Sequence, residues 1–344
     1  MIRLESERLI LRTFKKSDAK AMFQNWIGDP EVMRYLSDDA LESLQATEVF
    51  VEQWLSWFHK LPAGSAWHLF SIELKSTGEV IGTIDYHEDN QKTRAAETGY
   101  NIGKKWWGKG YATEALRTMI DYCFKETGLT RIWANHDSRN VSSGKVLAKA
   151  GMQHEATFRK AKSIKGEITD DIHYAILKED WEIANEIEYY NRLPFHFEDF
   201  ISVPTLSNGE IFLVCTEKTP AIPEKNWVPS YTFAICKDGE KVGRINLRLG
   251  YNESLYYSGQ VGYETDEVYR GKGYAGQACR LLLPVAKAHK MKKLLLTTNI
   301  TNTASKKVCE KIGARLVREA RLPKWHDLYA GGQRYINLFE FSVD

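Results

Sequence analysis

The strongest constraint on the fold of this chain is an internal repeat with a period of about 163 residues. The clearest block is Trp107-Gly-Lys-Gly-Tyr-Ala112, which matches Arg270-Gly-Lys-Gly-Tyr-Ala275 at five of six positions. Shorter blocks match in the same order at nearly the same offset: Gly78–Gly82 with Gly239–Gly243, Gly99-Tyr100 with Gly262-Tyr263, and Asn140-x-x-Ser143 with Asn302-x-x-Ser305. A period of this length indicates a duplicated domain rather than a solenoid. A chance pair of glycine turns would explain the hexapeptide alone and not the flanking blocks.

The repeat divides the 344 residues into two domains. We expect the first domain at residues 1–182, a linker at 183–204 and the second domain at 205–344. In the second copy, only 15 residues separate a strand ending at Cys215 from one beginning at Tyr231, and three of them are prolines. This leaves no room for the helical pair expected near the start of the first copy. The two substrate pockets are therefore predicted to differ.

The charge balance excludes binding to nucleic acid or to an anionic membrane by bulk charge alone. Lys and Arg number 47, Asp and Glu number 45, and the net charge is +2, which creates no strong field around the molecule. The five cysteines include no Cys-x-x-Cys pair, and the histidines show no metal-ligand spacing. We therefore expect neither a disulfide framework nor a metal. Apolar runs are too short for a signal peptide or a membrane helix, which predicts a cytoplasmic protein with no membrane partner.

Each copy alternates strand-like and helix-like patterns in the same order. In the first copy, the expected elements are a strand at 3–12, helices over 18–59, strands at 67–74, 79–86 and 95–102, a helix at 111–125, a strand at 130–135, a helix at 141–149 and two strands over 154–178. In the second copy, they are strands at 231–236, 241–248 and 257–264, a helix at 272–289, a strand at 293–298, a helix at 303–311 and two final strands. The pattern predicts an α/β (α+β) fold in each copy.

In both copies, a glycine-rich turn lies between a strand and a helix, and such a turn is suited to binding phosphate. Gly108 and Gly110 would let the backbone approach an anion, and the start of the next helix presents free N–H groups. Gly271 and Gly273 stand at the same places in the second copy. The turn is not a P-loop, because Gly-Lys-(Ser/Thr) is absent from both copies. It also lacks the third glycine of a dinucleotide fingerprint.

The second-copy turn Arg270–Ala275 resembles the (Gln/Arg)-x-x-Gly-x-(Gly/Ala) motif of the GNAT superfamily of N-acetyltransferases, and Asn302–Gly313 is similar to that family's later Asn…Gly helix. The first copy resembles the RimJ/RimL-type branch in four segments: Glu7–Arg12, Asp29–Leu36, Trp107–Ala115 and Asn140-x-x-Ser143. The resemblance covers nearly all of the first copy, and the second copy from about residue 230. It implies two tandem domains, each a mixed, mostly antiparallel sheet flanked by helices. Two central strands are expected to splay apart and admit the pantetheine arm of acetyl-CoA.

The resemblance also implies the residues that bind acetyl-CoA, the expected cosubstrate. The turn would hold the pyrophosphate, while the preceding strand and the Asn before the later helix would contact the pantetheine. In the first copy these residues are Ile102, Gly103, Trp107, Gly108, Lys109, Gly110, Tyr111, Ala112 and Asn140. In the second copy they are Tyr263, Arg270, Gly271, Lys272, Gly273, Tyr274, Ala275 and Asn302.

Acetyl transfer by direct attack needs a base, because a free alkyl amine has a pKa of about 10, and it needs a hydrogen-bond donor or acid for the leaving thiolate. In many relatives a Tyr seven residues after the Asn serves as this acid, and neither copy has one there. The RimJ/RimL-like resemblance points instead to Ser143 and Ser305, as acids or as hydrogen-bond donors. Glu97 in the first copy and Glu264 in the second are the candidate bases, with a solvated strand carboxylate as the alternative for each.

The predicted function is transfer of an acetyl group from acetyl-CoA to a primary amine, either of a protein N-terminus or of a small molecule. The alternative is that one or both domains bind acyl-CoA, or a partner, without chemistry. The first copy has the fuller fold and is the favoured catalyst, and activity in the second stays open. The expected partner is the amine substrate, bound by a pseudo-dimeric monomer that is free to associate further.

Overall fold

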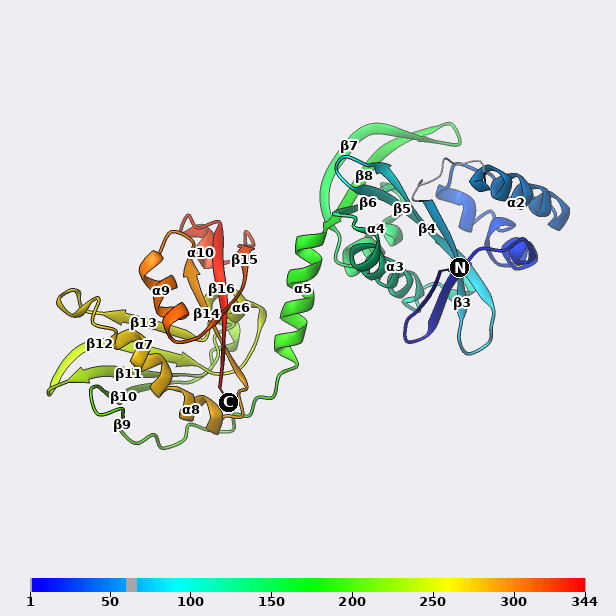
Figure 1. Ribbon diagram of the computed structural model, residues 1–344. Helices are drawn as coiled ribbons and strands as arrows, with labels where there is room; N and C mark the ends of the chain where they lie inside the picture. Colours follow the sequence, from blue (N-terminus) through cyan, green and yellow to red (C-terminus); the bar gives the residue numbers. More distant parts are fainter. Residues whose placement is uncertain (1, 60–66, 344) are drawn as a thin grey trace. The chain divides into compact units, whose positions relative to one another are not determined.

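The computed structural model describes residues 2–59 and 67–343, and contacts within the chain divide it into two compact units (Figure 1). The first unit is Met1–Glu182 and the second is Ile183–Asp344. Each unit has a hydrophobic core of its own. The division falls where the repeat predicts the first domain to end.

Within its described residues, the first unit is built on an eight-stranded sheet with the order β1-β2-β3-β4-β5-β6-β8-β7. The strands are β1 (Arg3–Glu5), β2 (Leu9–Thr13), β3 (Trp67–Leu74), β4 (Val80–Asn90), β5 (Ala95–Ile102), β6 (Arg131–Asp137), β7 (Gln153–Ile164) and β8 (Glu167–Leu177). Neighbouring strands in this sheet are antiparallel, apart from the parallel pair β5 and β6. The mixed, mostly antiparallel sheet confirms the predicted fold class.

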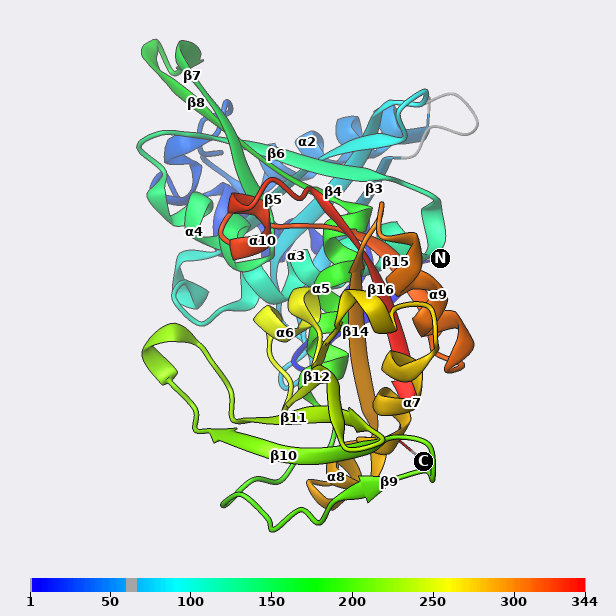
Figure 2. The same cartoon turned by 90° about the vertical axis from the view of Figure 1, so that its left-hand side faces the viewer.

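Helices cover both faces of this sheet. On one face, α3 (Tyr111–Tyr122) and α4 (Val141–Lys149) pack on alternate apolar residues of the central strands, which form the larger core. On the other face, α1 (Ala19–Met22) and α2 (Leu44–His59) pack near Leu69. The hairpin of β7 and β8 is long and curved, and it extends beyond the rest of the sheet (Figures 1 and 2).

The helical stretch that the sequence predicts over 18–59 is interrupted in the structure. After α1 the chain forms a π-helical turn at Phe23–Ile27 and a 3-10 turn at Val32–Tyr35, before α2 begins. Gly28 and Pro30 separate the two turns. Proline lacks the N–H that a continuing helix needs and disfavours helical dihedrals in the residue before it, so one long helix cannot form here.

Within its described residues, the second unit has a five-stranded sheet, β13-β12-β11-β10-β9, and a three-stranded sheet, β14-β16-β15. The strands are β9 (Leu206–Ser207), β10 (Phe212–Thr219), β11 (Ser230–Lys237), β12 (Glu240–Arg248), β13 (Val261–Thr265), β14 (Lys293–Asn299), β15 (Arg315–Arg321) and β16 (Tyr335–Ser342). In Figure 2, β14 and β16 run across the direction of β10 and β11. The first unit joins the equivalent halves in one sheet through β5 and β6, whereas the second unit separates them.

The helices of the second unit differ from the prediction in two places. They are α6 (Glu253–Ser258), α7 (Tyr274–Leu281), α8 (Leu283–Ala288), α9 (Thr303–Lys311) and α10 (Asp327–Ala330). The helix predicted at 272–289 is divided, because Pro284 stands in the first turn of α8 and cannot continue the hydrogen bonds of α7. The strand predicted at 257–264 is shortened, because Asn252 caps α6 by accepting a hydrogen bond from the Leu255 amide at 2.8 Å.

Residues 183–204, expected as a linker, pack on the second unit. Helix α5 (Lys178–Asn191) buries Ile183 and Tyr190 in an apolar cluster of that unit. The Tyr190 hydroxyl donates a hydrogen bond to Glu340 at 2.9 Å. Phe197 also packs against the second core, so burial of apolar side chains keeps this segment against the unit.

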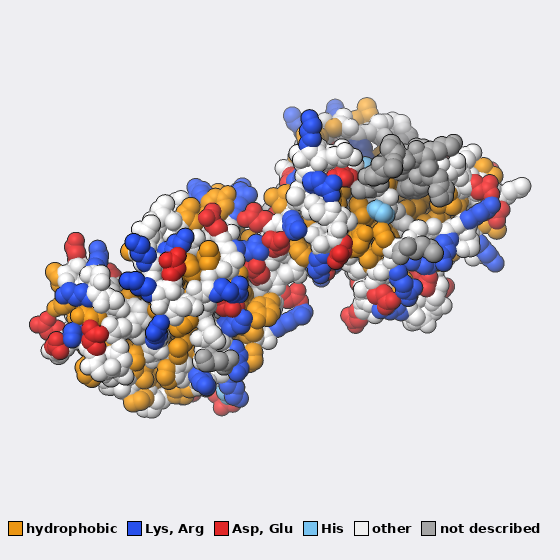
Figure 3. All heavy atoms as spheres, viewed as in Figure 1, with side chains coloured by type: hydrophobic (Ala, Val, Ile, Leu, Met, Phe, Trp, Pro, Cys, Tyr) orange, Lys and Arg blue, Asp and Glu red, His pale blue; other side chains and the backbone are white. Residues whose placement is uncertain are grey.

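The front of the second unit lacks the helical pair of the first, as the sequence predicts. The described residues 205–229 contain β9, β10 and one 3-10 turn at Pro223–Lys225. Across the described residues, no helix is both long enough and apolar enough to cross a membrane. Side chains of both charges are interspersed on the face shown in Figure 3, in keeping with the net charge of +2.

A buried ion pair joins the start of the α1 segment to the sheet and supplies a test of the fold. Asp18 is 4% exposed and accepts bidentate hydrogen bonds from Arg12 at 2.8 and 2.9 Å. The Ser71 hydroxyl donates to the same carboxylate at 2.6 Å. Burial opposes these bonds, yet they lower the pKa of Asp18 below its usual value, so the stabilisation is present above the unfolded pKa and is lost as the pH falls.

We predict that Asp18→Ala lowers the free energy of unfolding of the first unit by about 1.5–3 kcal/mol near neutral pH, because Arg12 loses its bidentate partner and keeps only Glu73, at 2.7 Å. Denaturant titration monitored by tryptophan fluorescence measures the loss, which should shrink under acidic conditions. Glu52→Ala is the control, since its ion pair with Lys16 is exposed and should contribute less than about 1 kcal/mol. Equal losses for the two variants would contradict the prediction.

Candidate active site

An opening in the first sheet arises where two parallel strands part. β5 pairs with β6 only from Ala95 to Glu97, opposite Arg131–Trp133. Beyond Glu97, β5 continues to Ile102 and stays paired with β4 on its other side. Its backbone groups on the side of β6 are therefore available to an extended ligand, because strand edges present unpaired N–H and C=O groups. This parting is the splay that the family resemblance implies.

The glycine turn lies between β5 and α3 and leaves the start of that helix uncapped. Gly108 and Gly110 have φ values of +72° and +81°, a region that side-chain-bearing residues rarely adopt. Gly110 is the N-cap residue of α3 and offers no side chain to the first N–H groups of the helix. These free donors and the positive end of the helix dipole make the turn a binding site for an anion.

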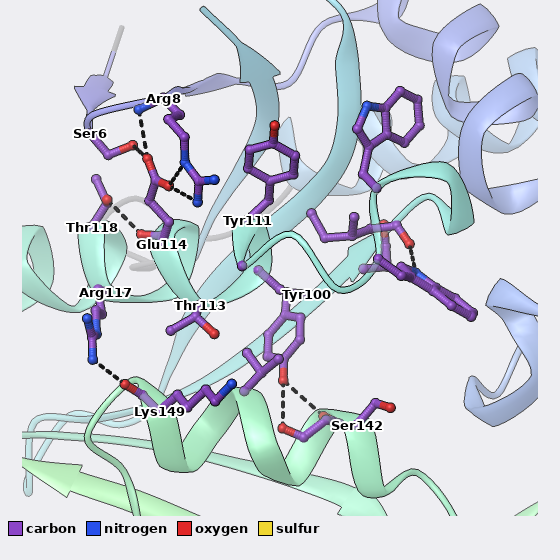
Figure 4. A pocket seen from close by; sticks show the side chains of 18 of the residues that line it. Ser6, Arg8, Tyr100, Tyr111, Thr113, Glu114, Arg117, Thr118, Ser142 and Lys149 are labelled. Carbon is purple, nitrogen blue, oxygen red and sulfur yellow. Dashed lines mark hydrogen bonds and ion pairs between the residues drawn. The ribbon is translucent and has the colours of Figure 1, made fainter.

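A carboxylate on α3 ties this turn to the N-terminal segment of the chain. Glu114 accepts hydrogen bonds from the Ser6 hydroxyl at 2.7 Å and from Nε of Arg8 at 2.7 Å (Figure 4). The Arg8 guanidinium also donates to the Lys109 carbonyl at 3.1 Å and lies 4.5 Å from the centre of the Tyr111 ring. Arg8 therefore holds the turn in place, and its charge is paired with Glu114.

The opening and the turn belong to one pocket of about 1550 Å³. Pockets that bind drug-sized ligands have volumes of roughly 300–1,000 Å³, so this pocket has room for a larger ligand. Among the predicted first-copy residues, the lining includes Ile102, Trp107, Gly108, Gly110, Tyr111, Ala112 and Asn140. Gly103 and Lys109 are not part of the lining. The Gly103 amide instead donates to the Ile81 carbonyl at 2.9 Å, and the Lys109 carbonyl is bonded to Arg8.

A tyrosine and a serine meet in this pocket from different elements. The Tyr100 hydroxyl on β5 lies 3.0 Å from the Ser143 hydroxyl on α4 and donates to the Ser143 carbonyl at 3.1 Å. Asn140 positions this end of α4, because its side chain accepts a hydrogen bond from the Ser143 amide at 3.2 Å. Burial raises the pKa of Tyr100 to about 12, with the Ser143 hydrogen bond opposing the shift. The phenol therefore keeps its proton near neutral pH.

The predicted base lies on the opposite face of the same strand. Successive side chains of a strand point to opposite faces, so Glu97 and Tyr100 lie on either side of β5. Glu97 is the last residue that pairs with β6, and its carboxylate is 3.4 Å from Nε2 of His87. Burial raises the pKa of Glu97, while His87 opposes the shift and Asp89 adds to it. A carboxylate with a raised pKa is a stronger proton acceptor than a solvated one.

A second carboxyl group, Asp85, accompanies Glu97 on this face. Asp85 on β4 pairs with Gly99 on β5, two positions along the strands from the pair of His87 with Glu97 and so on the same face. A Cβ at Gly99 would lie 3.1 Å from the Asp85 carboxylate, so this glycine leaves space for it. Burial first, and then the charge of Glu97, raise the pKa of Asp85 to about 7. Two neighbouring carboxyl groups here favour a cationic ligand.

The second unit has the same geometry as the first around its glycine turn. Gly271 and Gly273 have φ values of +79° and +84°, and α7 begins without a side-chain cap. The Tyr263 hydroxyl lies 2.6 Å from that of Ser305. Asn302 accepts a hydrogen bond from the Ser305 amide at 3.0 Å. The predicted cofactor residues of this copy therefore adopt the same local arrangement as their first-copy counterparts.

Trp107 and its counterpart Arg270 make the same hydrogen bond to the preceding strand with different side chains. The Trp107 indole donates to the Ile102 carbonyl at 2.6 Å, and Nε of Arg270 donates to the matching Thr265 carbonyl at 3.3 Å. Each side chain thus ties its turn to the end of the preceding strand. The expected charge of Arg270 is retained at the turn, whereas Trp107 is an uncharged substitute.

The candidate base of the second unit, Glu264, lies in a different environment from Glu97. Glu264 and Arg244 form an ion pair at 3.0 Å, and their side chains are 60% and 67% exposed. An exposed, paired carboxylate matches the alternative of a solvated strand residue. Its catalytic role stays a prediction, as does that of Ser305.

Sequence reasoning missed three residues of the first site: Arg8, Asp85 and Tyr100. Arg8 bonds to Glu114 across a separation of 106 residues, and nothing local in the sequence indicates that contact. Tyr100 did carry a signal, because the dipeptide Gly99-Tyr100 recurs as Gly262-Tyr263. Among the residues that the structure describes, no group of three or more His, Cys, Asp or Glu side chains is arranged to hold a metal ion.

Comparison with known proteins identifies relatives of this chain. A family model described as an acetyltransferase (GNAT) domain matches residues 8–153 and 204–315. The chain is 33% identical over 178 residues to the uncharacterised N-acetyltransferase p20 of Bacillus licheniformis, a match that covers 52% of this chain and 97% of that protein. It is 28% identical over 187 residues to the ribosomal protein uS5 alanine N-acetyltransferase of Escherichia coli, covering 52% of this chain and 93% of that protein. A solved GNAT-family acetyltransferase from Bacillus anthracis is 30% identical with a TM-score of 0.45, over 52% of this chain and 99% of that one.

The raised pKa of Asp85 predicts a distinctive dependence of stability on pH. An unfolded Asp has a pKa of about 3.9, and the folded value is about 7, so the folded state binds more protons between these values. The free energy of unfolding should therefore fall as the pH rises through this window. Asp85→Asn should remove this fall, with a gain of up to about 4 kcal/mol at pH 8 and none at pH 4.

Chemical denaturation of the wild type and the variant across this pH range measures the difference. The second unit has Asn246 at the matching position, where its side chain accepts a hydrogen bond from the Gly262 amide at 2.8 Å. The fold therefore accommodates an amide at this site. Parallel pH profiles for the two proteins would show that Asp85 is ionised in the folded state.

Proposed function

The chain belongs to the acetyltransferase (GNAT) family, and from this membership we propose that its first unit transfers an acetyl group from acetyl-CoA to a primary amine. The observation that carries the proposal is the arrangement at the parting of β5 and β6. A carboxylate with a raised pKa lies on one face of β5, a protonated phenol lies on the other, and an anion site follows at the end of the strand.

The pocket of the first unit is suited to acetyl-CoA, the cosubstrate that supplies the acetyl thioester. The free N–H groups after Gly108 and at the start of α3 would hold the pyrophosphate, as anions bind at helix N-termini. Arg8 lies beside this site, with a nitrogen 3.5 Å from the place where a Gly110 Cβ would lie, and it braces the turn while its charge is paired with Glu114. The free edge of β5 leads from this turn towards Glu97 and would receive the pantetheine arm. The same turn in the second unit supports CoA binding there as well.

Glu97 is our proposed general base. An alkyl ammonium has a pKa of about 10, so it must lose a proton before its lone pair can attack the thioester carbon. The Glu97 carboxylate takes this proton, and the Asp85 carboxyl beside it favours the approach of the cation. The new C–N bond then forms as the carbonyl oxygen becomes an oxyanion, which backbone N–H groups on the open edge of β5 would stabilise.

Tyr100 is our proposed donor to the leaving sulfur. When the C–S bond breaks, the Tyr100 hydroxyl transfers its proton to the thiolate of CoA. The second proton of the amine nitrogen then restores the phenol, so that one proton leaves through Glu97 and one ends on the sulfur. Ser143 positions the phenol through their 3.0 Å contact, which gives the serine predicted from the sequence a positioning role.

The acceptor amine belongs either to a protein N-terminus or to a small molecule. The name of the Escherichia coli relative assigns it an alanine of ribosomal protein uS5, and this supports a polypeptide N-terminus as the first acceptor to test. A panel of short peptides with free N-termini and of small alkyl amines, assayed for release of the CoA thiol, tests the proposal. No turnover on any amine would leave CoA binding without chemistry as the function.

We predict that Glu97→Gln lowers kcat/KM for the amine by about 10²–10⁴-fold, the usual contribution of a general base. The base must be ionised, so the rate of the wild type should fall as the pH drops through the raised pKa of Glu97. The variant should lose this acidic limb of the pH profile. Glu52→Gln, at an exposed position on α2, is the control. An acidic limb that persists in Glu97→Gln would assign the base to another group.

We predict that Tyr100→Phe lowers kcat by about 10²-fold and leaves the dissociation constant of CoA unchanged, because the phenol acts on the leaving group rather than on the anion. Ser143→Ala should cost less, since it removes a positioning contact and keeps the donor. Steady-state kinetics and calorimetric CoA binding measure both effects. A larger loss in Ser143→Ala than in Tyr100→Phe would make the serine hydroxyl the donor.

A further inference from the structure

The two units share the glycine turn and the uncapped helix start, but they differ on the opposite face of the central strand, where an amine would enter. Asp85 and Gly99 face each other in the first unit, and Asn246 and Gly262 do so in the second. The repeat offset of 163 residues places Gln260 at the position of Glu97. Both acidic side chains of the first unit are thus replaced by amides in the second.

Gln260 has no freedom to act on a ligand. It is 0% exposed, whereas the Glu97 side chain is 32% exposed. Its side-chain nitrogen donates to the Gly250 carbonyl at 3.0 Å, and its side-chain oxygen accepts from the Leu295 amide at 2.5 Å. Its backbone amide also donates to the Leu295 carbonyl at 2.8 Å. Gln260 therefore fastens the start of β13 to β14.

The sheet surface beside this position is partly exposed in the first unit, whereas in the second it is apolar and buried. In the first unit, Trp133 on β6 pairs with Glu97, and the stacked His173 on β8 lies with its ring centre 5.6 Å from that of Trp133. The side chain of His173 is 26% exposed. In the second unit, Leu295 on β14 adjoins Gln260, and Leu338 lies on the neighbouring β16. These leucines are 1% and 0% exposed.

Two helices cover these leucines. Tyr256 and Tyr257 of α6 are buried in one cluster with Leu295 and Leu338, together with Ile183 of α5. A polar network holds the helices there: the Tyr256 hydroxyl donates to Glu186 of α5 at 2.6 Å, and Arg318 donates to Glu186 at 2.7 Å. The charged groups on this face are therefore already paired with each other.

We propose that the second unit holds CoA without transferring its acetyl group, because α5 and α6 occupy the face where an amine would enter, and that transfer takes place in the first unit alone. This inference rests on the proposed function and adds a division of labour to it. No proton acceptor replaces Glu97 at the matching position, and the apolar cluster excludes a cation from the same surface, since an unpaired buried charge is strongly unfavourable.

A variant that blocks one turn at a time tests the proposal on the full chain. Gly110→Phe places a bulky side chain over the first anion site. We expect the wild type to bind two CoA molecules per chain in a calorimetric titration. The variant should bind one and lose all turnover on the amine that the wild type uses. Turnover that survives in the variant would overturn the proposal, because it would have to come from the second unit.

Two further measurements keep this result interpretable. Gly108→Phe is the alternative block, in a place where an added Cβ meets no atom within 4 Å, and thermal unfolding identifies any variant that fails to fold. Binding of no CoA by the folded, blocked variant would also overturn the proposal. The double variant Asp85→Asn with Glu97→Gln gives the first unit the residues of the second, and it should keep two CoA sites and lose turnover. Retained turnover there would contradict the proposed base and not the division between units.

Discussion

The parting of β5 from β6 after Glu97 is the constraint on which the rest of the first unit depends. Parallel strands require a crossover connection, and here the crossover contains α3, which begins directly after the glycine turn. The pairing that ends at Glu97 therefore leaves a free strand edge that points towards an uncapped helix start. Fold, anion site and strand edge all follow from one short stretch of parallel pairing.

The alternation of side chains along β5 then divides the chemistry between two faces. Glu97 and Tyr100 lie on opposite sides of the strand, so the proposed proton acceptor and the proposed donor would flank the thioester. Each group has its pKa shifted by burial, and in both cases the shift favours its proposed role. Of the two acidic side chains on this face, Asp85 and Glu97, ionisation of Asp85 is the more strongly opposed by burial. Asn246 shows that an amide makes the same contact with a strand glycine, so the negative charge of Asp85 is not needed to hold the fold together.

The features that sequence predicts well here are those determined by the local backbone. The glycines at 108 and 110, the helices that begin at Val141 and Thr303, and the strands β3 and β5 all lie where their local pattern places them. The contacts that sequence did not predict join distant residues, such as Arg8 with Glu114 and Tyr100 with Ser143. Helix α6 was missed for another reason. Its tyrosines favour strands by propensity, and burial against β14 together with the Asn252 cap outweighs that preference.

The duplication shows which parts of such a site tolerate change. The turn depends on backbone dihedrals and on a helix start, so replacing a glycine there would strain the fold as well as the site. The amine side depends on side chains alone. Exchanging Glu97 for Gln260 and His173 for leucine at the matching strand leaves the strands in place, and it converts a polar surface into one that buries apolar area against a helix. Under the proposed division of labour, a copy would lose its amine site and bury more apolar area by the same substitutions, while the glycine turn stays intact.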